Sequence, residues 1–140
     1  MSRAAAKEEI IRSRIKKYRK DAEKCTEKDP VSLLNYHRTR ADWRGQITCE
    51  ITDALAAWDC WTRPAREIAQ CKGITHAFAD KLCGETMNAI CFMNNDCKDC
   101  RDAHLVAGAM LAAFTDVSPA NRDLIRKNYE ILAKKAANLK

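Results

Sequence analysis

Residues 49–83, CEITDALAAWDCWTRPAREIAQCKGITHAFADKLC, hold four of the eight cysteines of this 140-residue chain: Cys49, Cys60, Cys71 and Cys83. Their spacings are 11, 11 and 12 residues, and because eleven residues are three helical turns to within about 20°, Cys49 and Cys60 share a helical stripe. The segment Thr62-Arg63-Pro64 lies at their centre and predicts a break. If the chain folds back there, Cys60 faces Cys71 and Cys49 faces Cys83. The spacing therefore predicts an antiparallel helical hairpin with two nested disulfides, the alternative being unlinked, buried thiols.

Two cysteine pairs on two antiparallel helices resemble the coiled-coil-helix-coiled-coil-helix family of mitochondrial proteins. The resemblance rests on Cys49, Cys60, Cys71 and Cys83 and covers about 35 of the 140 residues. It implies nested bridges and a non-catalytic role as an accessory or assembly subunit of a larger complex, such as a respiratory complex. It also implies import into the mitochondrial intermembrane space without a cleaved signal.

The composition favours helices throughout. The chain has only four glycines and three prolines, and apolar residues recur with a helical rather than a strand period. We expect an all-α fold of five or six helices around the disulfide-stapled antiparallel hairpin. No stretch reaches the roughly 18 apolar residues that a membrane span requires. The longest apolar run, residues 105–114, indicates a buried helix.

The predicted helices cover about residues 4–27, 30–61, 62–72, 76–93 and 97–114, with a last helix after Ser118-Pro119. Residues 94–96 are expected to form a loop, with Asp96 as an N-cap. Among the tryptophans, Trp58 is expected in the core, and Trp43 and Trp61 are either interface anchors or ordinary packing residues. The inner side of the last helix is predicted to carry Leu124, Ile131, Leu132, Ala136 and Leu139.

The net charge of +6 is concentrated at the two ends of the chain. Residues 1–24 hold nine Lys and Arg against four acids, and residues 117–140 hold six against two. We divide the single structural domain into a polar, basic N-terminal helix (1–28), a cysteine-rich helical core (29–116) and a basic C-terminal helix (117–140). The basic ends suit acidic partners or charged surfaces, the alternative being solvated helix faces.

The remaining cysteines are Cys25, Cys91, Cys97 and Cys100, and we expect them to form disulfides whose order the sequence leaves open. A different prediction joins Cys91, Cys97, Cys100 and His104 in a zinc site, because the last three share one helical stripe. The same spacing is also compatible with an iron–sulfur cluster or a redox-active dithiol. The disulfide interpretation is preferred, and on it no cofactor and no metal are expected.

No nucleophile has an identifiable base near it in the sequence, so we expect a protein that is not an enzyme. The preferred function is a structural or interaction protein whose partners are other protein subunits. One alternative is a secreted, periplasmic or virion-associated helical protein with the same disulfides. Another is a cytosolic zinc protein associated with nucleic acid. Nucleic-acid binding is the weaker prediction, since Tyr18 is the only aromatic residue among the basic residues of the N-terminal helix that could stack on a base.

Overall fold

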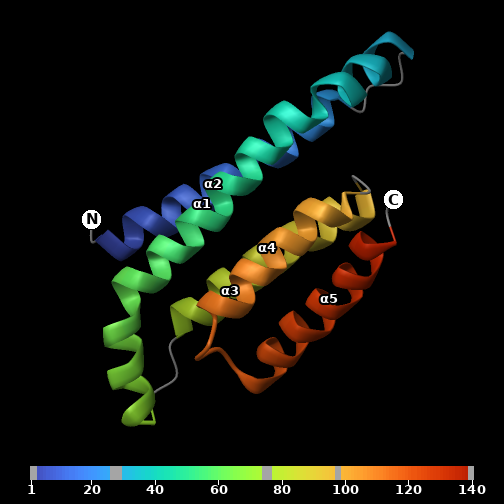
Figure 1. The fold of residues 1–140 in the computed structure, drawn as a ribbon. Helices are drawn as coiled ribbons and strands as arrows, with labels where there is room; N and C mark the ends of the chain where they lie inside the picture. The colour runs from blue at the N-terminus through green and yellow to red at the C-terminus, as the bar shows by residue number, and fades with distance from the viewer. Residues whose placement is uncertain (1–2, 26–29, 74–76, 97–98, 139–140) are drawn as a thin grey trace.

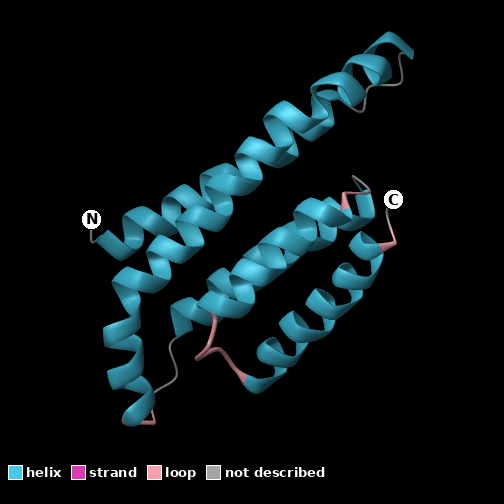
Figure 2. Ribbon diagram, viewed as in Figure 1, coloured by secondary structure: helices cyan, strands magenta, loops and turns pink. Residues whose placement is uncertain are grey.

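The computed structural model describes residues 3–25, 30–73, 77–96 and 99–138. This part of the chain is helical almost throughout and contains no strand (Figure 2). The all-α prediction is therefore confirmed. The elements in order are α1 (Arg3–Cys25), α2 (Pro30–Cys71), α3 (Ala77–Cys91), the π-helical segment η1 (Phe92–Asp96), α4 (Cys100–Ala113) and α5 (Pro119–Ala137).

The long helices α1 and α2 run antiparallel along each other (Figure 1). Helix α4 is central, because it packs against α2, α3 and α5, while α3 also contacts α1 and α5. Within the described ranges, no helix combines the length and the apolar character needed to cross a membrane.

One hydrophobic core joins the five helices. The predicted apolar seam of α1 contributes Ile11, Ile15 and Tyr18, which are buried because they recur every three or four residues on one face. Helix α2 contributes Ile51 and Trp58, both fully buried, as the periodicity predicts. The predicted core position of Trp58 is therefore confirmed.

A glycine of α4 and the N-cap of α5 hold α5 against its neighbours. Gly108 of α4 lies where an added Cβ would be 3.4 Å from the Tyr129 ring of α5, so the two helices approach closely. The predicted start of α5 is confirmed: Ser118 is the N-cap, and its hydroxyl accepts a hydrogen bond from the Asn121 N–H. Asp80 of α3 accepts a further bond from the Ser118 N–H at 2.9 Å and thus ties α5 to α3.

The predicted break at Thr62-Arg63-Pro64 is wrong, because α2 continues through it to Cys71. Thr62 does not cap a new helix; its hydroxyl donates to the Trp58 carbonyl at 2.7 Å, one turn earlier in the same helix. Pro64 has no N–H for the carbonyl four residues earlier, which weakens the helix there without ending it. Figure 1 shows α2 changing direction in this region. We call residues 61–72 the arm.

Two smaller predictions also need correction. Residues 92–96 form the π-helical segment η1, where we expected a loop at 94–96, and α4 begins at Cys100 with Asp99 as its N-cap. On α5, Leu124 and Ile131 face solvent, while Ile125 and Leu132 are buried. A helix on the outside of the bundle buries one narrow stripe, and the stripe of α5 is centred on Ile125 and Leu132. Leu139 lies outside the described residues.

Candidate interaction surface on α2

The predicted bridge between Cys60 and Cys71 is wrong. Both residues belong to α2, and both are free, exposed thiols. Eleven residues of helix separate their Cα atoms by about 16 Å, whereas a disulfide needs about 4.4–6.8 Å. The two cysteines lie far apart along one helix and do not face each other across a hairpin.

The predicted bridge between Cys49 and Cys83 is absent as well. Cys49 is exposed on α2 and Cys83 is buried in α3, and both are free thiols. Because α2 does not fold back at Pro64, α3 packs against α1, α4 and α5 and does not pair with α2 across a hairpin. Burial raises the pKa of Cys83 to about 11, and the nearby charge of Asp80 acts in the same direction. Cys83 is therefore a protonated core residue.

The second cysteine cluster, Cys91, Cys97, Cys100 and His104, lies only partly within the described residues. Cys91 is exposed and Cys100 is buried, and both are free thiols. His104 lies one turn after Cys100 and packs its ring on Tyr129, with 4.9 Å between ring centroids. Cys97 and the Cys25 side chain lie outside the described residues. In the described part, no three ligand side chains come close enough to hold a metal ion, so the four-residue zinc site stays a prediction.

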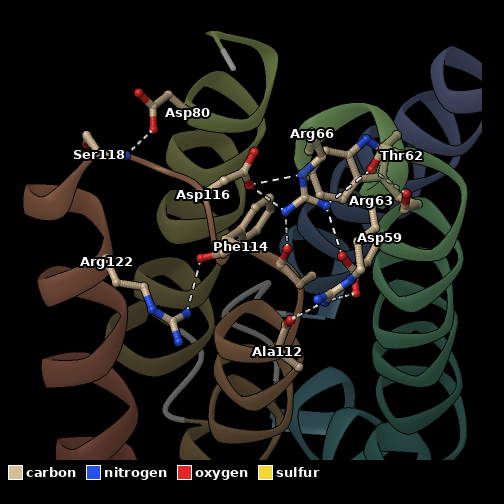
Figure 3. A network of polar contacts seen from close by, with 12 residues as sticks. Asp59, Thr62, Arg63, Arg66, Asp80, Ala112, Phe114, Asp116, Ser118 and Arg122 are labelled. Atoms are coloured by element: carbon tan, nitrogen blue, oxygen red, sulfur yellow. Dashed lines mark hydrogen bonds and ion pairs between the residues drawn. The ribbon is translucent and has the colours of Figure 1, made fainter. Parts of the chain in front are cut away.

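A buried ion-pair network, which the sequence analysis did not find, holds the beginning of the arm (Figure 3). The side chain of Arg66 is 2% exposed, and its guanidinium lies between two carboxylates. It donates to Asp59 Oδ1 at 2.9 Å, and its Nε donates to Asp116 Oδ1 at 2.9 Å. Arg66 also donates to the Ala113 carbonyl and to the Thr62 hydroxyl. Since Asp116 belongs to the α4–α5 connection, the network fixes the arm to the rest of the fold.

The side of the arm that faces away from Arg66 is apolar and exposed. Trp61 is 51% exposed and Ile68 is 59% exposed, and they lie seven residues apart on one stripe. The stripe runs in steps of four, three, four and three residues through Ala57, Trp61, Pro64, Ile68 and Cys71. We call these five residues the docking face.

Two shallow surface grooves lie at the ends of the docking face. The first lies between α1 and α2 and is lined by Lys7, Ile10, Arg14, Glu50, Asp53, Ala54 and Ala57. The second lies on the arm and is lined by Pro64, Glu67, Ile68, Cys71 and Lys72. Ile10 in the first groove is 39% exposed, and Ala57 belongs both to this groove and to the docking face. The arrangement suits the binding of an extended apolar edge, such as one side of a helix.

Of the two predicted interface tryptophans, Trp61 is exposed, and the Trp43 side chain is outside the described residues. Periodicity alone could have indicated the docking face, because Trp61 and Ile68 fall outside the buried stripe of α2. The assumed break at Pro64 hid this relationship.

Comparisons with known proteins give no relative. No family model matches the chain, and neither a curated protein nor a solved structure matches it.

Proposed function

We propose that this chain is a non-catalytic interaction protein that binds a helix of a partner along the docking face. The observation that carries the proposal is the exposure of Trp61 and Ile68 on one stripe of a helix whose opposite side is fixed by buried Arg66. Tryptophan is enriched among the residues that dominate binding energy, and a rigid support lowers the entropy that binding costs.

The shape of the surface supports a helical partner. Anchors seven residues apart are about 10 Å apart along a helix, which is the repeat with which a second helix presents its own apolar residues. The grooves at both ends extend the same line onto α1 and past Ile68. A partner helix of four to five turns would span this surface.

The basic N-terminal helix supports nucleic-acid binding less well. Arg12 is held by Glu85 in a two-point ion pair, with Nε 2.7 Å from Oε2, and Arg14 pairs with Glu50. Arg19 stacks over the Phe92 ring at 4.7 Å. Three cations of the basic N-terminal helix are therefore used within the fold.

A role as an accessory subunit of a larger complex is compatible with this proposal. The expected location in the mitochondrial intermembrane space depends on the family resemblance, and the two disulfides on which that resemblance rests are absent. The docking face does not depend on this location, because it needs only the helical arm and its buried support.

Selection of peptides tests the proposal. A library of amphipathic helical peptides displayed on phage is selected against the reduced protein, and the bound peptides are measured on two variants. Ile68→Glu should weaken binding at least about tenfold, equivalent to about 1.4 kcal/mol, because it places a charge in the docking face. Leu105→Glu is the matched control, since Leu105 is 56% exposed on α4. Equal binding to wild type and Ile68→Glu would contradict the proposal.

A further inference from the structure

The outer face of α5 is the second exposed apolar surface in the described chain. Leu124 is 45% exposed and Ile131 is 53% exposed, again seven residues apart on one stripe. Three exposed lysines surround them: Lys127, Lys134 and Lys135. Within the described ranges none of the three lysines has an ion-pair partner, whereas the neighbouring Arg126 pairs with Asp123 at 2.6 Å. This surface suits a partner that offers both apolar contacts and carboxylates.

We infer that the docking face of one copy binds the outer face of α5 of a second copy. The inference rests on the proposed function and names the partner helix. The spacing of the anchors agrees, since Trp61 and Ile68 have the same separation along their helix as Leu124 and Ile131. Two helices packed side by side can then bring both pairs into contact at once.

The charges agree with an antiparallel arrangement of these two helices. With Leu124 against Ile68 and Ile131 against Trp61, Lys127 lies within about one turn of Glu67. In the same register, Lys134 and Lys135 extend toward Asp53 at the other end of the surface. Glu67 and Asp53 are both exposed. Opposite charges therefore meet beside the apolar contact and beyond its Trp61 end.

The charges disfavour a parallel arrangement of the two helices. With Leu124 against Trp61 and Ile131 against Ile68, Lys135 comes to lie beside Lys72 of the arm, and Lys134 lies one position away. Like charges at an interface disfavour that orientation. The charge pattern thus selects one direction as well as one partner surface.

The contact joins two different surfaces, so a pair of copies keeps one free docking face on one copy and one free α5 on the other. Such head-to-tail contacts generate closed rings or open chains of molecules, and not a two-fold dimer. The contact has few large anchors and exposed ion pairs, which added salt weakens. We expect reversible assembly that depends on protein concentration and decreases at high salt.

Sedimentation velocity on the reduced, full-length protein and three variants tests the inference. Wild type should gain weight-average mass as concentration rises toward about 1 mM, where a contact worth about 4 kcal/mol is half formed. Ile68→Glu and Ile131→Glu should each remain monomeric. Leu105→Glu should assemble like wild type. Circular dichroism and thermal unfolding check that each variant is folded, as expected for substitutions at side chains that are about half exposed.

An equimolar mixture of Ile68→Glu and Ile131→Glu is the decisive sample. The first variant keeps an intact α5 and the second keeps an intact docking face, so the mixture should form a one-to-one dimer and nothing larger. A mixture that stays monomeric would overturn the inference, as would a wild type that is monomeric throughout. Assembly abolished by Ile68→Glu but not by Ile131→Glu would overturn the choice of α5. That outcome would leave the docking face itself, and hence the proposed function, intact.

Discussion

The guanidinium of Arg66 lies over the indole of Trp58, 4.5 Å from the ring centroid, and both side chains are almost fully buried. The two residues are eight positions apart on α2, on either side of the turn that contains Thr62 and Pro64. A cation on an aromatic face gains electrostatic stabilisation, and more so when water is excluded. The contact therefore bridges the weakest turn of the helix and supports the arm from its inner side.

Replacing Arg66 by Met should destabilise the protein strongly. The substitution keeps an unbranched side chain but leaves the carboxylates of Asp59 and Asp116 without their shared cation. Breaking a buried ion pair from one side costs about 3–5 kcal/mol of unfolding free energy. Urea unfolding measures the loss. Arg126→Ala is the control, since it removes an exposed pair and should cost less than about 1 kcal/mol. Equal losses for the two variants would contradict the buried network.

Replacing Pro64 by Ala should stabilise the protein. Pro64 is exposed, so its ring contributes little packing, and Ala restores the missing N–H donor in the middle of α2. Proline costs about 3 kcal/mol relative to alanine in a helix interior, of which the observed bend relieves a part. We expect a gain of about 1–3 kcal/mol in urea unfolding. A loss of stability would instead show that the bend is needed to bring Arg66 to Asp116.

The cysteines should differ sharply in their reaction with iodoacetamide on the folded protein. Cys49, Cys60, Cys71 and Cys91 are exposed and should be alkylated within the first phase. Cys83 should react far more slowly, because it is 1% exposed and its pKa of about 11, against 9.0, lowers its thiolate fraction about a hundredfold. Mass mapping of the modified peptides gives the order in which the cysteines react. Rapid labelling of Cys83, or protection of Cys60 and Cys71, would contradict the structure.

The pKa of Cys83 also sets the sign of a pH effect on stability. Between pH 9 and 11 the unfolded chain releases the Cys83 proton while the folded chain retains it. The contribution of Cys83 to stability is therefore present below pH 9 and is lost as the pH rises through this window. Urea unfolding of wild type and Cys83→Ala across the window isolates the effect as the difference between the two slopes.

The sequence predicted the helices better than it predicted their connections. Hydrophobic periodicity located the core faces of α1 and α2, because burial of one stripe is a local property that a repeat of three or four residues records. Ser118-Pro119 located the start of α5, because a cap acts within one turn. These elements depend on neighbours in the sequence, so the sequence alone was sufficient.

The cysteine pairing was wrong because it depended on whether α2 ends at Pro64. A proline inside a helical pattern either ends or bends the helix, and tertiary contacts decide between the two. Here Arg66 forms an ion pair with Asp116, which is 50 residues away in sequence, and this pair can form only if the helix continues. The same non-local reason explains α5: the packing of α4 decided that Ile125, and not Leu124, is buried.

The indole N–H signal of Trp61 in nuclear magnetic resonance spectra of the reduced protein shows whether the outward side of the arm is a binding surface. We expect this signal to move steadily as the protein is concentrated toward about 1 mM, while that of buried Trp58 stays in place. We also expect Ile131→Glu, on a different helix, to abolish the movement. A Trp61 signal that stays fixed over the whole range while the protein assembles would show that the outward side of the arm is not the binding surface.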